Sequence, residues 1–181
     1  MTLLSTGTDY EALAARFRPI FERIATETVA RELNRTLPYE PIRWLKEAGF
    51  GTVRIPQEKG GFGASLPQLF ALFSELAQAD SNLPQALRGH FAFVEDQLNR
   101  PESELRDRWF RRFLDGDIVG NGWTETGEVK LGDVLTKVTP TENGWRLTGE
   151  KFYSTGTLFA DWIDVFGRRS DTGGDIIALV N

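Results

Sequence analysis

The sequence predicts an α+β fold in which an all-helical N-terminal domain, residues 1–116, precedes a β domain, residues 117–181. Two observations carry this prediction. Apolar residues recur at helical spacing before residue 117 and at every second position after it. Turn signals also multiply in the second part, at the spacing of short strands in a barrel or sandwich rather than in a parallel sheet.

The first helix is expected to begin after Asp9, a residue type that caps helix N-termini, and to reach Val29 with a kink at Pro19. Its apolar residues have helical spacing and are Tyr10, Leu13, Phe17, Ile20, Phe21, Ile24 and Val29. Pro38 and Pro41 end this stretch.

Shorter helices follow. One carries residues 42–46 and stops at Gly49, and the next, residues 69–76, starts from a capping box formed by Ser65 and Gln68. Two further helices are expected. The apolar residues of the first are Leu83, Leu87, Phe91, Val94 and Leu98. The second starts at Pro101, ends at Gly116 and carries Leu105, Trp109 and Phe113 on one side.

Short strands are expected in the β domain. Asn143-Gly144 predicts a hairpin turn. The expected strands are residues 117–125, 134–140, 145–149, 150–154, 161–167 and 175–181. The last one reaches the C-terminal residue without a polar closing segment, so we expect the β domain to be incomplete.

The composition is that of a globular protein, with 40% hydrophobic and 26% charged residues. A net charge of −5 argues against a nucleic-acid partner, and the absence of cysteine excludes disulfides, thiolate metal sites and a cysteine nucleophile. Residues 1–17 lack the features of a signal peptide, and no apolar run is long enough for a membrane span. We therefore expect a cytoplasmic protein without a membrane partner.

The glycine-rich stretch 59–65, KGGFGAS, has two possible structural interpretations. It follows a short extended run, as a dinucleotide-binding loop does, but Leu66 stands where the third glycine of that motif belongs. The sequence therefore favours a tight loop whose glycines adopt positive φ.

His90 is the only histidine of the chain. On a mostly apolar helix face, such a residue is more often a hydrogen-bonded packing residue than a functional one. One histidine without nearby carboxylates does not make a zinc site, and the G-x-S-x-G motif of a serine hydrolase is missing.

Two polar segments stand at expected strand ends. Residues 120–127, GNGWTETG, combine glycines with a Thr-Glu pair, and Tyr153-Ser154-Thr155-Gly156 brings three hydroxyl side chains together. If the two strand ends lie side by side, they can hydrogen-bond the edge of a flat heterocycle, with Tyr153 as an aromatic face. The plain alternative for the first segment is a strand end and turn.

At these residues the chain resembles the acyl-CoA dehydrogenase superfamily of flavoproteins. The resemblance spans nearly the whole chain and is carried by three segments in the family's order: EAGFGTVRIPQEKGGFGAS at 47–65, GWTETG at 122–127 and LTGEKFYSTGTLFADWIDV at 147–165. The last segment is similar to the family's NGxKxxITNGxxAD pattern and is the most specific of the three.

The resemblance implies a flavin site. Thr155 corresponds to the family's contact with the N5/O4 edge of the flavin, and Tyr153 to the aromatic residue that packs on the ring. Thr124 corresponds to the contact with the pyrimidine side, and Trp123 and Ser154 would complete the cradle through their backbone. The serine of the family's GSD sequence, which helps to hold the phosphates of FAD, is missing from the run TETGEVKLGD at 124–133, so the cofactor is expected to be FMN or FAD.

Within the superfamily, Ser154 before Thr155, Asn121 ahead of Thr124 and the sequence GHF at 89–91 look more like the monooxygenase branch. This branch includes sulfur-acquisition and thiophene-desulfurising enzymes. These take reduced flavin from a separate reductase and use oxygen to oxygenate a small organosulfur substrate. The resemblance implies that His90, Asn121 and Ser154 face the flavin's reactive side and the substrate, and that the full-length protein is a homo-oligomer.

Two other functions remain open at this stage: an FAD-dependent acyl-CoA dehydrogenase, and a non-catalytic truncated fragment. Family members continue into a C-terminal four-helix bundle that covers the flavin, and this bundle is absent from the sequence. We therefore expect the chain by itself to be inactive and to bind flavin weakly or not at all.

Overall fold

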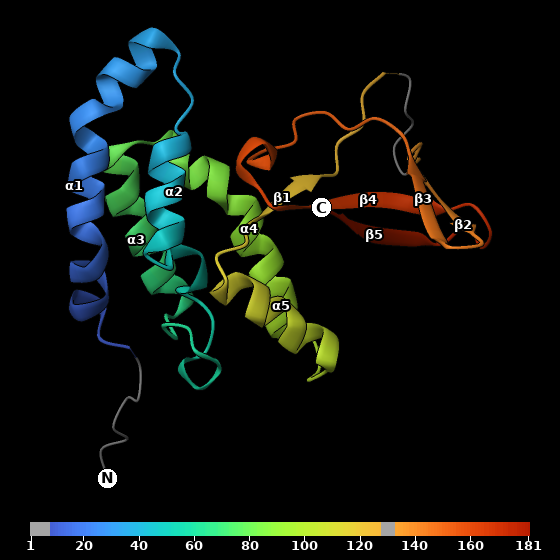
Figure 1. Ribbon diagram of the computed structural model, residues 1–181, viewed down its shortest axis with the longest axis horizontal. Coiled ribbons are helices and arrows are strands. Elements are labelled where there is room, and N and C mark those ends of the chain that lie inside the picture. The colour runs from blue at the N-terminus through green and yellow to red at the C-terminus, as the bar shows by residue number, and fades with distance from the viewer. Residues whose placement is uncertain (1–7, 128–132) are drawn as a thin grey trace. The chain divides into compact units, whose positions relative to one another are not determined.

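The computed structural model describes residues 8–127 and 133–181 (Figure 1). The chain divides into two compact units, Met1–Ile118 and Val119–Asn181, called the helical unit and the β unit below. Helices build the first unit and strands the second, except for one short 3-10 helix, and this confirms the expected α+β fold class. The domain limits expected from the sequence, 1–116 and 117–181, stay a prediction.

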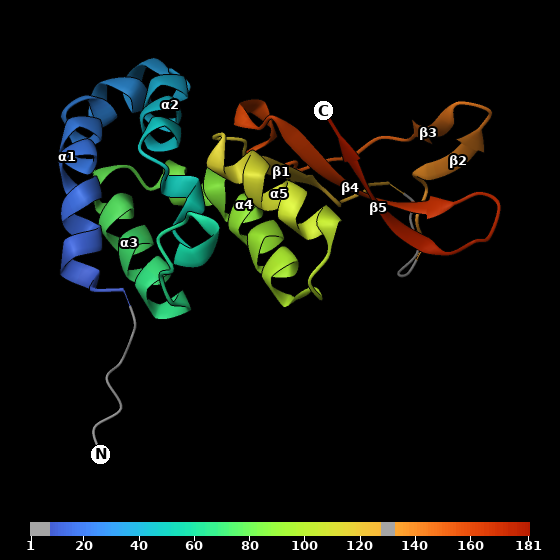
Figure 2. The same cartoon turned by 60° about the horizontal axis from the view of Figure 1, so that its bottom comes forward.

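The described residues of the helical unit form five α-helices, seen from two directions in Figures 1 and 2. Their bounds are α1 (Tyr10–Asn34), α2 (Tyr39–Glu47), α3 (Leu66–Ala79), α4 (Asn82–Asn99) and α5 (Glu104–Leu114). Two 3-10 helices, η1 (Phe50–Thr52) and η2 (Gln57–Lys59), lie between α2 and α3. Among the described helices, none combines the length and the apolar character that a membrane-spanning helix needs.

Local capping signals fix most of the helix ends. Asp9 caps α1 by accepting a hydrogen bond from the Glu11 backbone, and the capping box of Ser65 and Gln68 is present at α3. Pro19 lies inside α1 without ending it. Gly49 adopts a φ of 78° directly after α2, the conformation in which a glycine stops a helix.

The expected start of the last helix at Pro101 is wrong. The Ser103 hydroxyl accepts a hydrogen bond from the Arg106 backbone at 3.2 Å, so α5 begins at Glu104. Leu105 is 50% exposed and does not share the buried side of α5 with Trp109 and Phe113. A serine cap therefore sets this helix start rather than the proline before it.

Aromatic rings fill the core of the helical unit. Phe50 is 1% exposed, and its ring centroid lies 5.1 Å from that of Phe17, 5.9 Å from Phe21 and 6.0 Å from Phe91. A second group of rings joins α4 to α5, with Phe93 and Trp109 at 4.9 Å. The edge-to-face geometry of most of these pairs is the arrangement that aromatic rings prefer.

The described residues of the β unit form one mixed sheet around β4. Its strands are β1 (Val119–Gly122), β2 (Lys137–Thr141), β3 (Gly144–Thr148), β4 (Trp162–Arg169) and β5 (Asp175–Val180). On one edge β4 pairs in parallel with β1 along its first half and with β2 at its end, and on the other edge it pairs antiparallel with β5. The strand spacing alone did not predict these parallel pairs.

The hairpin expected at Asn143-Gly144 is confirmed, because β2 and β3 pair antiparallel with Thr141 opposite Gly144. The strand expected at 150–154 is wrong. Only a single bridge, between Thr124 and Phe152, lies in this stretch, and the 3-10 helix η3 (Thr157–Phe159) follows. Tyr153 adopts a φ of 53°, which a strand cannot accommodate, and the chain therefore leaves the sheet there.

Candidate functional site

The two polar segments singled out in the sequence lie side by side in the β unit. The Phe152 backbone N–H donates a hydrogen bond of 2.8 Å to the carbonyl of Thr124, and these residues form the bridge between the segments. Trp123 and Thr124 follow the end of β1, and Tyr153 to Thr155 follow Phe152. The structure thus brings Trp123, Thr124, Tyr153, Ser154 and Thr155 to one edge, which we call the paired edge.

Exposed aromatic and hydroxyl groups gather on the paired edge. Tyr153 is 80% exposed, Trp123 is 46% exposed, and the Thr124 and Ser154 side chains face solvent as well. The Trp123 ring stacks on that of Phe166 at 5.5 Å, which fixes its plane. The left-handed backbone of Tyr153 costs free energy in a residue other than glycine, and such strain is concentrated at functional sites.

Asn121 lies in β1, two residues before the paired edge. Its Oδ1 atom is buried and has no hydrogen-bond partner among the described residues, and its backbone carbonyl accepts a hydrogen bond from the Thr157 hydroxyl at 3.4 Å. Buried amide oxygens are normally satisfied. A ligand that donates a hydrogen bond at this position would satisfy this one.

His90 lies on α4 in the core of the helical unit and is 1% exposed. Its Nε2 atom is 2.8 Å from the Gly51 carbonyl, and since a carbonyl only accepts, Nε2 carries a proton. The rings of Phe91 and Phe113 lie edge-to-face with the imidazole, at 5.1 and 5.2 Å. These contacts are those of a packing residue, and the role of His90 toward a substrate stays a prediction.

Backbone N–H groups of the glycine-rich loop 59–65 are used in hydrogen bonds to nearby backbone carbonyls. The N–H groups of Gly61, Gly63 and Ala64 donate to carbonyls of residues 53–56, so they do not point together at a bound phosphate. A Cβ on Gly61 would lie 2.3 Å from the Ile55 carbonyl oxygen, and the close approach of these two backbones requires glycine. The structure supports the tight loop.

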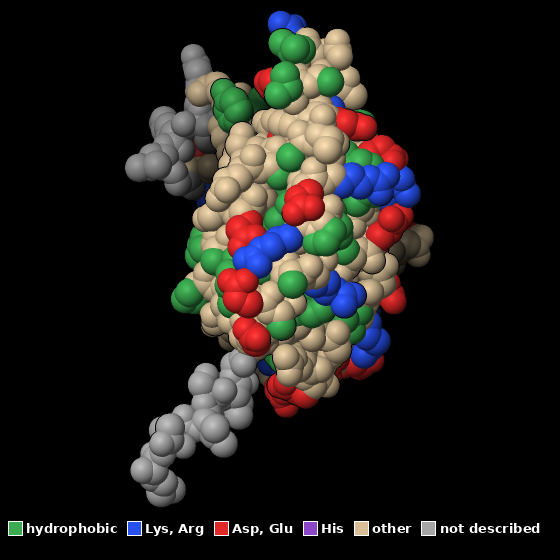
Figure 3. Space-filling view, turned by 90° about the vertical axis from the view of Figure 1, so that its left-hand side faces the viewer, with side chains coloured by type: hydrophobic (Ala, Val, Ile, Leu, Met, Phe, Trp, Pro, Cys, Tyr) green, Lys and Arg blue, Asp and Glu red, His purple; other side chains and the backbone are tan. Residues whose placement is uncertain are grey.

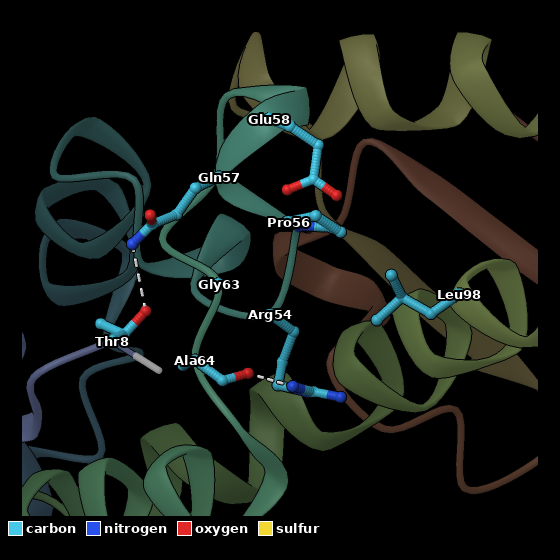
Figure 4. Close-up of a pocket in the computed structure, with 8 residues that line it drawn as sticks. All are labelled: Thr8, Arg54, Pro56, Gln57, Glu58, Gly63, Ala64 and Leu98. Carbon is cyan, nitrogen blue, oxygen red and sulfur yellow. Dashed lines mark hydrogen bonds between the residues drawn. The ribbon is translucent and has the colours of Figure 1, made fainter. Parts of the chain in front are cut away.

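The same loop borders a pocket of about 330 Å³ (Figure 4). Arg54, the cation that lines it, pairs with Glu95 at 2.5 and 3.1 Å and also donates to the Ala64 carbonyl. Glu58 adds a carboxylate to the lining. With its cation already paired and a carboxylate nearby, the pocket offers little to an anionic ligand.

Charges on the face that α1 presents in Figure 3 are of both signs and are interspersed with apolar side chains. Arg18 on this helix pairs with Glu11 at 2.7 Å and with Glu75 of α3 at 2.8 Å. The pair with Glu75 joins α1 to α3, whereas the pair with Glu11 lies within α1. Ion pairs on such solvated faces contribute modestly to stability.

The sequence reasoning missed Glu125. Burial alone would raise the pKa of its carboxyl, but hydrogen bonds from Lys151, Thr136 and the backbone of Leu135 outweigh burial and lower the pKa to about 2. Glu125 is thus ionised and fully bonded directly beside Thr124. The signal available in the sequence was a Thr-Glu pair, and it does not reveal partners that lie 10 to 26 residues away.

With the geometry established, comparison with known proteins identifies the family. Residues 8–117 match the N-terminal domain of the acyl-CoA dehydrogenases. The chain belongs to the acyl-CoA dehydrogenase family. The family resemblance drawn from the three sequence segments is therefore confirmed.

Relatives in both branches of the family are similar to the chain. It is 30% identical to a benzylmalonyl-CoA dehydrogenase of Aromatoleum aromaticum over 88% of the chain and 43% of the relative. It is 32% identical to a dibenzothiophene monooxygenase of Rhodococcus erythropolis over 74% of the chain and 33% of the relative. The chain thus spans less than half the length of the curated relatives it matches.

Among solved structures, the chain is similar to the dibenzothiophene monooxygenase TdsC of Paenibacillus sp. A11-2, crystallised with FMN and indole. The two share 25% sequence identity and superpose with a TM-score of 0.78, over 95% of this chain and 44% of that one.

Proposed function

We propose that the complete protein binds a flavin, FMN or FAD, at the paired edge. The observation that carries the proposal is the hydrogen bond from Phe152 to Thr124, because it joins the two segments that the family resemblance assigns to the flavin. Exposed rings and hydroxyls suit a planar heterocycle with polar edges. The buried, unpaired Oδ1 of Asn121 beside this edge also fits a ligand that donates hydrogen bonds.

Each residue of the paired edge has a proposed task. Thr124 and Thr155 hydrogen-bond the ring edge, the aromatic faces of Trp123 and Tyr153 cover the ring, and the backbone at Trp123 and Ser154 completes the contact. The flavin supplies the redox chemistry when bound. The protein's part is to hold the ring in one orientation and to exclude water from its reactive side.

The proposed reaction is the oxygenation of an organosulfur or related small substrate by reduced flavin. Similarity to the dibenzothiophene monooxygenases supports it. In this proposal a separate reductase supplies the reduced flavin, Asn121 and Ser154 face the substrate, and the complete protein is a cytoplasmic homo-oligomer.

His90 has two proposed roles. In one it donates a hydrogen bond or proton at the substrate side of the flavin. In the other it ties α4 to Gly51 and packs between Phe91 and Phe113, and its contacts support this second role. The two roles are separated by an experiment given in the Discussion.

A second candidate function is the dehydrogenation of an acyl-CoA thioester with FAD. The similarity to benzylmalonyl-CoA dehydrogenase supports it, because that relative matches 88% of this chain. The missing serine in the run 124–133 weighs against it; residues 128–132 of that run lie outside the described residues. A non-catalytic fragment remains the third candidate.

One experiment separates the three. The complete protein is purified, its released flavin is identified by mass spectrometry, and two reactions are assayed in parallel. Oxygenation of dibenzothiophene that depends on reduced FMN and oxygen supports the monooxygenase, whereas reduction of an electron-accepting dye by acyl-CoA supports the dehydrogenase. Protein that carries no flavin and performs neither reaction contradicts both enzymes and leaves the fragment.

A further inference from the structure

Glu125 is a buried carboxylate at which three stretches of the β unit meet. One oxygen accepts from the Leu135 N–H at 2.7 Å; the other accepts from the Thr136 N–H at 2.8 Å and from the Thr136 hydroxyl at 2.6 Å. Lys151 donates to the same oxygen at 2.8 Å. A single side chain thus fixes the chain before β2 and the chain after β3 to the segment that follows β1.

Lys151 completes this arrangement, which we call the clamp. The side chains of Glu125 and Lys151 are 7% and 10% exposed, so the ion pair is shielded from water and from salt. The ammonium group also donates to the Trp123 carbonyl at 3.4 Å and lies 6.0 Å from the centre of the Phe166 ring, on which Trp123 stacks.

The chain before β2 and the chain after β3 approach closely beside the clamp. A Cβ on Gly149, two residues before Lys151, would lie 2.7 Å from the Thr136 Cα atom. Thr136 itself is 1% exposed. The clamp therefore joins segments that already pack closely against each other.

The clamp residues are direct chain neighbours of the paired edge. Glu125 follows Thr124 in the chain, and Lys151 precedes Phe152 and Tyr153. The Phe152-to-Thr124 hydrogen bond is therefore flanked by the ion pair. Buried ion pairs often add little net stability, because desolvation offsets the attraction, and in some proteins they instead specify one arrangement of the groups that they join.

We propose that Glu125 and Lys151 are positioning residues that set the distance and orientation between the two flavin-binding segments. This inference rests on the proposed function for its flavin, although the arrangement of the segments does not need one. Neither residue is proposed to touch the flavin or the substrate. Their effect on binding passes through Trp123 and Thr124 on one side and through Phe152 and Tyr153 on the other.

The test measures two quantities in the complete protein: the hydrogen-exchange rate of the Phe152 amide without flavin, and the dissociation constant for FMN. Glu125→Gln and Lys151→Met each remove the charge pair while keeping most of the side-chain volume. We expect each variant to exchange the Phe152 amide at least about tenfold faster and to bind FMN at least about tenfold more weakly. The double variant should have an FMN dissociation constant no higher than that of the single variant that binds FMN more weakly, because the two partners act as one unit.

Asp175→Asn is the matched control. It breaks the Arg168–Asp175 pair of 2.9 Å in the same sheet, where the side chains are 35% and 51% exposed, and it should change neither quantity. If Glu125→Gln fails to fold, Lys151→Met decides, because its stem keeps the packing.

The two quantities separate the inference from the proposed function. Faster exchange in the variants together with no FMN binding by the wild type would reject the flavin proposal and keep the clamp. Exchange at the control's rate in folded Lys151→Met would overturn the clamp whatever the protein binds.

Discussion

The helical unit and the β unit are stabilised in different ways. Among the described residues, 24 hydrophobic side chains are buried in the helical unit, whereas only Val119, Val138 and Val165 are buried in the β unit. The helical unit therefore rests on apolar burial. The described part of the β unit relies more on backbone pairing and on buried polar contacts such as the clamp.

The groups suited to chemistry follow the same division. The helical unit encloses His90 in its core at 1% exposure, whereas the β unit presents Tyr153 at 80% exposure. A group enclosed in the core contributes to packing. An exposed aromatic side chain on a strained backbone is typical of a ligand-binding position. This contrast places the candidate site on the β unit, and each prediction below tests one side of it.

The largest expected effect is on the helical core. Phe50→Ala should lower the free energy of unfolding by about 3–5 kcal/mol, because it removes a ring that contacts several others and leaves a cavity. Urea unfolding followed by tryptophan fluorescence measures the change. The comparison with the β unit would be weakened by a loss below about 1 kcal/mol.

The clamp should make the stability of the β unit depend on pH. The pKa of Glu125 is lowered in the folded state, so its contribution is fully present above the pKa of an unfolded glutamate, about 4.3. It is lost as pH falls from there toward about 2. We expect wild type to lose roughly 2–3 kcal/mol more than Glu125→Gln across this window. Parallel curves of unfolding free energy against pH for the two proteins would contradict the clamp.

His90→Ala should lower the free energy of unfolding by about 1–3 kcal/mol, because the Gly51 carbonyl loses its partner and two aromatic rings lose a neighbour. Oxygenation per folded molecule decides the chemical role, in which His90 donates a hydrogen bond or proton at the substrate side of the flavin. Positioned acid–base groups contribute about 10²–10⁴-fold in rate. A fall of that size would establish the chemical role, and unchanged turnover would leave packing as the whole explanation.

The smallest expected effect on stability is an increase rather than a loss. Tyr153→Gly should stabilise the unliganded protein by up to about 1 kcal/mol, since glycine adopts a φ of 53° without strain. The same change should weaken FMN binding, because the aromatic face is lost. A melting temperature and an FMN titration are sufficient, and a variant that is less stable but binds normally would show that Tyr153 serves the fold.

Local signals could be predicted from the sequence. The capping box at Ser65, the stop at Gly49 and the hairpin at Gly144 each depend on a few neighbouring residues, and each is confirmed. The strand expected at 150–154 was wrong because the left-handed backbone of Tyr153 interrupts the extended chain. The amino-acid sequence of this stretch does not indicate that conformation. The clamp was missed because Glu125 bonds to residues far along the chain.

The central claim is that the paired edge binds flavin, and equilibrium binding of FMN to the complete protein tests it most directly. Thr124→Val and Thr155→Val remove the two hydroxyls with little change in volume, and Thr141→Val, at an exposed position of β2, is the control. We predict that the double variant binds FMN at least about tenfold more weakly than wild type, a loss of about 1.4 kcal/mol or more, while the control binds as wild type does. Equal dissociation constants for all three folded proteins would contradict the claim.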